Sequence, residues 1–256
     1  MTADPVVSRG RHFQRRAMSI LSLHNVSKSF GALIVTDDVS FDVPQGEALG
    51  IIGPNGAGKS TLFNLITGNL PADKGRIEFD GVDVTTVSPM KRCLSGVGRS
   101  FQIPQPFTNL TVFENLVVAA THGRNRAERD VTDSCATILK RTELFERAND
   151  TAGSLSLLQR KRLELARAMA THPKLLLLDE IAGGLTEGEC QALIQTIRAI
   201  HSEGVTIIWI EHVLHALNSV VERLLVLDFG KVIGLGAPAA IMDSREVKEI
   251  YLGIDI

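Results

Sequence analysis

The sequence predicts an α/β protein with a parallel sheet at its centre, a small antiparallel sheet near its amino terminus and an inserted helical segment. Three continuous apolar runs, at residues 47–53, 174–180 and 204–212, have the composition of strands that are buried on both faces. A helical pattern over residues 187–201 separates the last two runs. Since parallel neighbours need a crossover of helix length, this order of strand, helix and strand predicts a parallel sheet.

Residues 20–43 predict the antiparallel sheet. They contain three short runs, ILSLHNV, ALIVT and VSFDV, in which apolar and polar residues alternate between turn residues. A hairpin that turns at Asp80 and Gly81 is expected in GRIEFDGVDV. A second hairpin is expected in RLLVLDFGKVIGLG, followed by a short helix. Between the two hairpins, residues 111–171 have a mostly helical period.

The composition excludes several classes of protein. The 256 residues, with 44% hydrophobic and 22% charged side chains, suffice for a sizeable globular core. A net charge of −2 lacks the basic footprint of a nucleic-acid-binding domain, so no nucleic-acid partner is predicted. Cys93, Cys135 and Cys190 have no C-x-x-C spacing, which disfavours a disulfide framework or a zinc site and fits a reducing cytoplasm. No apolar run approaches the roughly 18 residues that cross a bilayer.

Residues 1–18 form a basic start that contains Arg9, Arg11, Arg15 and Arg16. No apolar region follows them, as one would in a signal peptide. We expect this tail to be disordered, with contact to anionic lipid as the alternative. The patterned sequence, and with it the expected domain, extends over residues 19–256.

Residues 53–61, GPNGAGKST, match the phosphate-binding pattern G-x-x-x-x-G-K-[ST]. The match follows a buried strand and precedes a helical run, which is the context that such a loop requires. Its glycines let backbone N–H groups point at a phosphate, and the helix adds its positive amino-terminal dipole. We expect Lys59 to reach the β- and γ-phosphates and the Ser60 hydroxyl to bind Mg²⁺. The expected nucleotide-binding residues of this loop are Gly53, Pro54, Asn55, Gly56, Ala57, Gly58, Lys59, Ser60 and Thr61.

Two carboxylates, Asp179 and Glu180, end the apolar run that begins at residue 174. At the end of a strand beside a phosphate loop, Asp179 can hold Mg²⁺ directly or through water. Glu180 can polarise the attacking water as a general base. In the alternative, solvated acids merely end the strand, and the phosphate loop in the same chain disfavours that alternative.

About 120 residues separate Lys59 from Asp179, which is enough to insert a helical subdomain. With that spacing, the two motifs resemble the nucleotide-binding subunits of ABC transporters, and the likeness runs from about residue 20 to the end of the chain. The resemblance implies the ABC ATPase fold: a P-loop NTPase core with a parallel sheet, an antiparallel β subdomain and a helical subdomain over about residues 103–171. It also implies ATP and Mg²⁺ as cofactors, and ATP hydrolysis coupled to transport.

The resemblance assigns roles to three further side chains. Phe30, in KSFG, matches the aromatic residue that stacks on adenine, and such stacking contributes about 1–3 kcal/mol per base. Gln102, in RSFQIPQPF, matches the glutamine that contacts Mg²⁺ and senses the membrane partner, with Gln105 as the alternative. His212 matches the histidine that contacts the γ-phosphate, whereas we expect His215 to be a solvated helix residue.

Three stretches are more specific within the family. GRSFQIPQPFTNLTVFENLVVAA, EHV and the terminal YLGID resemble the branched-chain amino-acid uptake group, the Liv type. This resemblance implies import of a small solute, a branched-chain or related amino acid, although subunits of this kind do not select the solute.

The family's signature is altered in this chain. A short motif, often LSGGQ or, in the Liv group, LSYGEQ, begins the helix before the Asp-Glu strand. Ser156, Leu157, Leu158 and Gln159 occupy it here, and Leu158 stands where the second glycine is expected. Because two subunits sandwich ATP head to tail, the motif would face the partner's phosphate loop, where a leucine would crowd the γ-phosphate. In the alternative, Leu158 packs into the helical subdomain and the phosphate contact is left to Ser156.

Residues after the expected catalytic glutamate also depart from the family pattern. Ile181 stands where proline is common, and Thr186 where aspartate or asparagine usually lies across the dimer interface. Thr186 and Glu189 have the spacing of a capping box, so a helix is still expected to begin there. The change therefore affects the link between subunits and leaves the local fold intact. Val213 replaces an acidic residue, and we assign no consequence to it.

Together these observations predict an ATPase subunit at the cytoplasmic face of the inner (plasma) membrane. It would pair with a second ATP-binding subunit, a different chain, and drive import through two permease subunits, with a periplasmic solute-binding protein as an indirect partner. One alternative is a soluble ABC-type ATPase that acts on DNA or ribosomes, which the lack of a coiled-coil insertion or a paired domain disfavours. Another is a regulatory subunit that does not hydrolyse ATP; Glu180 and His212 argue against it, and Leu158 argues for it.

Overall fold

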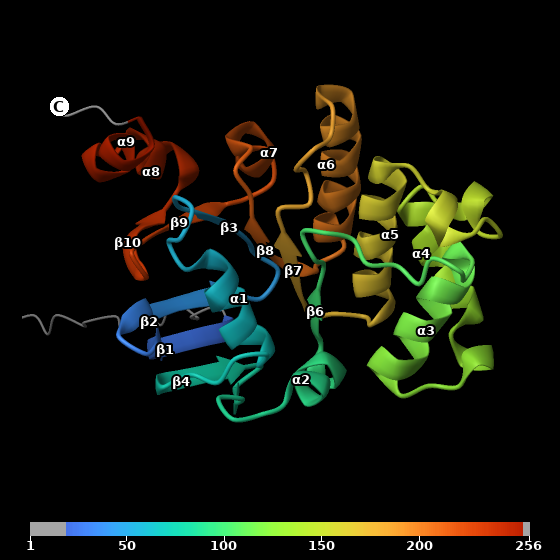
Figure 1. Cartoon of the computed structure of the whole chain (residues 1–256), viewed down its shortest axis with the longest axis horizontal. Helices are drawn as coiled ribbons and strands as arrows, with labels where there is room; N and C mark the ends of the chain where they lie inside the picture. Colours follow the sequence, from blue (N-terminus) through green and yellow to red (C-terminus); the bar gives the residue numbers. More distant parts are fainter. Residues whose placement is uncertain (1–18, 253–256) are drawn as a thin grey trace, which may run out of the picture.

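A computed structural model describes residues 19–252 as two sheets and a set of helices (Figure 1). The strands are β1 (Ser19–Phe30), β2 (Leu33–Pro44), β3 (Ala48–Ile52), β4 (Lys74–Phe79), β5 (Val82–Asp83), β6 (Val97–Arg99), β7 (Leu175–Asp179), β8 (Thr206–Ile210), β9 (Arg223–Asp228) and β10 (Lys231–Gly236). The α-helices are α1 (Lys59–Thr67), α2 (Pro89–Ser95), α3 (Val112–Arg124), α4 (Thr132–Arg141), α5 (Leu157–Ala170), α6 (Glu187–Ser202), α7 (Leu214–Asn218), α8 (Pro238–Asp243) and α9 (Arg245–Leu252). Short 3-10 turns are η1 (Glu128–Asp130), η2 (Phe145–Arg147) and η3 (Ala152–Ser154).

The larger sheet has six strands in the order β10-β9-β3-β8-β7-β6. Its strands are parallel to their neighbours except for β10, which pairs antiparallel with β9. Every residue of β3, β7 and β8 is buried, which explains their continuous apolar composition because both faces of the sheet are covered. The expected α/β fold with a central parallel sheet is confirmed.

The two faces of this sheet pack into two separate apolar cores, because successive residues of a strand point to opposite faces. Leu175 and Leu177 face a core that they share with α1 and the smaller sheet. Leu176 and Leu178 face a core that they share with α3, α4, α5 and α6. Helix α1 therefore lies between the two sheets, and this packing fixes the loop that precedes it (Figure 1).

The smaller sheet is antiparallel, in the order β2-β1-β4-β5, and its β4–β5 hairpin turns at Asp80 and Gly81 as predicted. The expected division of residues 20–43 into three strands is wrong, because LIVT of the second run and all of VSFDV lie in the single strand β2. The register shifts between the pairs Val26–Val39 and Lys28–Thr36, where Asp38 adopts a φ of 56°. A bulge of this kind bends a strand without ending it.

The helices α3, α4 and α5 lie together to one side of the larger sheet, at the right of Figure 1. The mostly helical period expected over residues 111–171 corresponds to these helices and to three 3-10 turns. Neither α2 nor β6 was predicted, since seven and three residues are too few to establish a period. Two helices, α8 and α9, follow β10 where one was expected. The basic tail of residues 1–18 lies outside the described residues.

The buried Arg92 of α2 fixes the carboxyl end of α1. Its Nη1 donates to the carbonyl oxygens of Leu65 and Ile66, each at 2.8 Å. Its Nε and Nη2 donate to the carbonyl oxygens of Val87 and Thr85 at 2.9 and 3.1 Å. The last carbonyls of a helix lack partners within it, so a cation here satisfies them and stabilises the helix dipole. Arg92 thus holds the helix that begins with the phosphate loop.

Candidate active site

The phosphate loop connects β3, which ends at Ile52, to α1, which begins at Lys59. Gly58 precedes the helix with a φ of 101°, and a Cβ there would lie 2.4 Å from the carbonyl oxygen of Val35. Only glycine fits this conformation and this close approach. The loop and the first turn of α1 line an open depression that also contains Val35 and Glu180. The positive end of the α1 dipole is therefore part of the depression.

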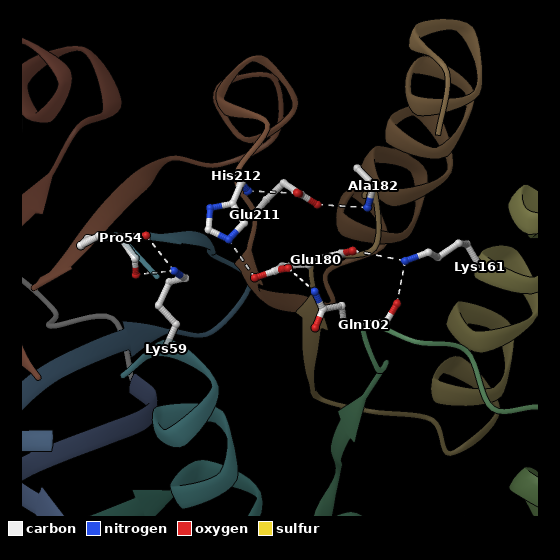
Figure 2. Close-up of polar contacts among 9 residues, drawn as sticks. Pro54, Lys59, Gln102, Lys161, Glu180, Ala182, Glu211 and His212 are labelled. Carbon is white, nitrogen blue, oxygen red and sulfur yellow. Dashed lines mark hydrogen bonds and ion pairs between the residues drawn. The ribbon is translucent and has the colours of Figure 1, made fainter. Parts of the chain in front are cut away.

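The Lys59 side chain lies inside the loop (Figure 2). Its Nζ donates to the carbonyl oxygen of Gly53 at 2.7 Å and to that of Pro54 at 3.0 Å. Burial lowers the pKa of Lys59, and the nearby charges of Glu180 and Asp179 oppose that shift. The two carboxylates thus help to keep the ammonium group charged, as its expected contact with phosphate requires.

Two of the predicted residues meet at the Glu180 carboxylate (Figure 2). His212 Nε2 lies 2.9 Å from Oε1, and the Gln102 side-chain amide donates to Oε2. Glu180 itself has a φ of 46°, a conformation that is uncommon for a residue other than glycine. Gln105, the alternative to Gln102, accepts a bond from Arg167 with its backbone carbonyl. The structure therefore directs Gln102 at Glu180.

Two buried charged residues beside Glu180 were not predicted. Lys161 Nζ donates to the carbonyl oxygens of Gln102 at 2.7 Å and Glu180 at 3.3 Å (Figure 2). The Glu211 carboxylate accepts from the backbone N–H groups of Ala182 and His212, both at 3.0 Å. Burial raises the pKa of Glu211 and lowers that of Lys161. The sequence does contain a signal for Glu211, which is an acid directly after the apolar run TIIWI. An acid that is buried at the end of such a strand needs hydrogen-bond donors around it.

Phe30 lies at the end of β1, with 49% of its surface exposed. The Lys28 ammonium group lies 5.6 Å from the centre of its ring. The residues that line the depression at the phosphate loop include Val35 of β2 and do not include Phe30. Its ring is accessible for stacking, and contact with adenine remains a prediction.

The altered signature forms the first turn of α5. Ser156 caps this helix in a capping box with Gln159, an arrangement that was not predicted. Leu157 is 46% exposed and lies beside Gly184, whereas Leu158 is half-buried and packs against the larger core. The position of Leu158 agrees with the packing alternative. The neighbouring loop begins α6 with the capping box of Thr186 and Glu189 that the sequence predicts.

His215 is half-exposed and lies 3.3 Å from Glu187, as expected for a solvated helix residue.

Asp179 forms a buried ion pair with Arg99 at 2.7 Å, a contact that the sequence did not predict. Residues 19–252 contain no group of three or more His, Cys, Asp or Glu side chains that could hold a metal ion. The expected donors are the Ser60 hydroxyl, the Gln102 amide and the Asp179 carboxylate. This oxygen-rich set with one carboxylate fits Mg²⁺, which takes its remaining ligands from water and phosphate.

Three features define the class of protein. They are a phosphate loop after one strand, a carboxylate pair at the end of a second strand and a histidine after a third strand. They are the parts of an enzyme that binds and hydrolyses a nucleoside triphosphate.

Comparison with known proteins narrows this class. The family model described as "ABC transporter" matches residues 36–183. The chain is 33% identical over 255 residues to a probable branched-chain amino acid transport ATP-binding protein, LivG, of Methanocaldococcus jannaschii, covering 93% of this chain and 99% of LivG. It is 35% identical over 251 residues to BraF of Pseudomonas aeruginosa, a high-affinity branched-chain amino acid transport ATP-binding protein, with 91% and 98% covered. It is 31% identical over 236 residues to LptB of Haemophilus influenzae, a lipopolysaccharide export system ATP-binding protein, with 92% and 98% covered.

Solved structures of ATP-binding cassettes share this fold. The crystal structure of the ADP conformation of an ATP-binding cassette from an ABC transporter superimposes with a TM-score of 0.84 at 33% identity. The match covers 93% of this chain and all of that chain. The chain therefore belongs to the ABC transporter family, and it is an ATPase, the ATP-binding subunit of a transporter. Of the helices described in residues 19–252, none is both long and apolar enough to cross a membrane.

Proposed function

We propose that this chain hydrolyses ATP to energise the uptake of branched-chain or related amino acids. Its similarity over more than nine-tenths of its length to LivG and BraF supports this substrate class. The observation that carries the hydrolytic part is the Glu180 carboxylate, which His212 and Gln102 contact at the edge of the depression that contains Lys59.

In this proposal, the loop of residues 53–61 binds the phosphates, Lys59 contacts the β- and γ-phosphates, and Phe30 stacks on adenine. Glu180 accepts a proton from the attacking water, and His212 orients Glu180 and contacts the γ-phosphate. Ser60, Gln102 and Asp179 hold Mg²⁺, which would offset the charge of the phosphates when bound.

The proposed partners are a second ATP-binding subunit, two permease subunits and, indirectly, a periplasmic solute-binding protein. The permeases would hold this chain at the cytoplasmic face of the inner membrane. A groove lined by residues of α2, β6, α3 and α5 supports a protein partner, since the exposed ring of Phe101 is part of its lining. Four further exposed apolar side chains belong to α2 or to the segment that follows β6: Met90, Leu94, Ile103 and Phe107. Phe101 and Ile103 flank Gln102, so a partner at the groove would be in contact with the segment that carries Gln102.

Uptake in cells tests the substrate class. Cells from which the gene for this chain is deleted should take up radiolabelled leucine, isoleucine and valine more slowly than the parent cells. The wild-type chain should restore the uptake, whereas Glu180→Gln should not. Unchanged uptake of all three amino acids, together with a defect in export of a lipid, would contradict import and favour a role like that of LptB.

The altered signature suggests that the second ATP-binding subunit is a different chain. The motif presents Ser156 and Leu157 at the surface where a partner's ATP is expected, and it lacks both glycines of LSGGQ. A partner with an intact signature would complete the site that contains Lys59. The site opposite Ser156 would then be the weaker of the two.

Leu158→Gly separates packing from obstruction of the partner's site. Because Leu158 packs against the core, we expect the free energy of unfolding to fall by about 2–3 kcal/mol, the sum of lost helix propensity and lost burial. The matched control, Leu157→Gly, changes an exposed leucine and should cost only about 1 kcal/mol. Urea denaturation measures both values. ATP turnover of the assembled transporter separates the two alternatives: a wild-type level with Leu158→Gly would support packing, and an increase would show that Leu158 obstructs the partner's site.

A further inference from the structure

Arg99, at the end of β6, extends its guanidinium group between β7 and α1. Its Nη2 donates to Oδ2 of Asp179 at 2.7 Å, and its Nη1 donates to Oδ1 of Asn64 at 2.6 Å. The side chains of Arg99 and Asp179 are only 10% and 7% exposed. One side chain therefore connects β6, the helix that follows the phosphate loop and the strand that carries the expected magnesium ligand.

Two aromatic rings hold the same guanidinium group. Its central carbon lies 5.5 Å from the centre of the Phe63 ring and 5.1 Å from that of Phe101. A guanidinium group stacks on aromatic faces and donates two bonds in a fixed fork, whereas a lysine ammonium group is a point charge on a flexible stem. The arrangement therefore fixes the direction of the bond to Asp179 as well as supplying a positive charge.

Stability alone is a weak explanation for this pair. A buried ion pair often contributes nothing to stability relative to apolar residues of similar volume, because both charges lose their hydration. Arg92, the other deeply buried arginine near α1, satisfies backbone carbonyls and so has a structural role. Arg99 instead contacts a carboxylate that the chemistry is expected to use.

We propose that Arg99 is a positioning residue for the Mg²⁺ site. Arg99 holds the Asp179 carboxylate by Oδ2 and so leaves Oδ1 available to bind the metal. Partners that orient a ligating side chain typically change metal affinity about 10- to 100-fold. This inference rests on the proposed role of Asp179 as a magnesium ligand. Because Gln102 lies three residues after Arg99, with Phe101 between them, the same contact also couples the Gln102 segment to Asp179.

The test measures the dependence of nucleotide binding on Mg²⁺, using the full chain and a fluorescent ATP analogue. Arg99→Met should leave the affinity in EDTA unchanged, because the phosphate loop is intact. It should raise the Mg²⁺ concentration for the half-maximal gain in affinity about 10- to 100-fold. Arg99→Lys should give an intermediate value, since it keeps the charge and loses the fork.

The matched control is Arg223→Met, which breaks another arginine–carboxylate pair at the opposite ends of the parallel strands. Arg223 Nε lies 2.7 Å from Oε1 of Glu47, where β9 and β3 begin. This variant should lower thermal stability and leave the Mg²⁺ dependence at the wild-type value. If Arg99→Met does not fold, Asn64→Ala removes the second anchor of the guanidinium group without leaving a charge unpaired. It should raise the half-maximal Mg²⁺ concentration by a smaller factor.

The outcomes separate this inference from the proposed function. Binding by the wild-type chain that does not depend on Mg²⁺ would remove the proposed metal site, and with it the role of Arg99. In another outcome, nucleotide binding by the wild-type chain depends on Mg²⁺, but a folded Arg99→Met or Asn64→Ala variant has the same half-maximal Mg²⁺ concentration as the wild type. That outcome would show that Arg99 is only structural. A lower half-maximal concentration in Arg99→Met would show that Arg99 competes with the metal and would equally overturn the inference.

Discussion

Glu180→Gln should retain ATP binding and lose ATP turnover by a factor of about 10²–10⁴, the usual contribution of a general base. The substitution keeps the size of the side chain, so His212 and Gln102 can still lie against it. An amide cannot accept the proton of the attacking water as a carboxylate can. The loss should therefore fall on the chemical step and spare the binding of nucleotide.

The measurement compares ATP turnover of the assembled transporter with the affinity of the chain for a fluorescent ATP analogue. Glu187→Gln is the matched control, because Glu187 is an exposed acid at the start of α6 that pairs with His215. It should keep both turnover and affinity. Wild-type turnover in Glu180→Gln would remove Glu180 from its proposed role and would favour a regulatory subunit that binds nucleotide without hydrolysing it.

Continuous apolar composition predicted the parallel sheet because β3, β7 and β8 are buried on both faces and so leave no polar face to obscure them. The phosphate loop was predictable for a different reason. Its residues are contiguous, and each is demanded by local geometry, as the positive φ of Gly58 shows. Both features depend on short stretches of sequence.

The contacts that organise the site were not predictable, because they join residues that are far apart in the chain. Arg99 and Asp179 are separated by 80 positions, and Lys161 and Gln102 by 59. They meet because β6 pairs with β7, and because α5 packs beside that edge of the sheet. Strand order is a property of the whole fold, and β6 is only three residues long. The side chain of Leu158 illustrates the same limit, since its burial depends on neighbours that the helical period alone does not identify.

Lys59→Ala should weaken ATP binding by about 10- to 100-fold, because a hydrogen bond to a charged group contributes about 1.5–3 kcal/mol. The expected contact is with the β- and γ-phosphates, so the affinity for ADP should fall by a smaller factor than that for ATP. Fluorescence titration with both nucleotides measures the difference. Lys74→Ala, which removes an exposed lysine of β4, is the control and should change neither affinity.

The same substitution also removes the bonds from Lys59 to Gly53 and Pro54, which hold the loop around the ammonium group. Thermal unfolding in the absence of nucleotide therefore has to accompany the titration, because a loop that rearranges would lose affinity indirectly. Lys59→Arg separates the loss of the phosphate contact from the rearrangement of the loop. It keeps the positive charge that contacts phosphate, but its bulkier head group distorts the loop. If the phosphate contact dominates, ATP affinity should rank wild type, then arginine, then alanine. Equal affinity of Lys59→Ala and the wild type for ATP would show that the backbone of the loop binds the phosphates without this side chain.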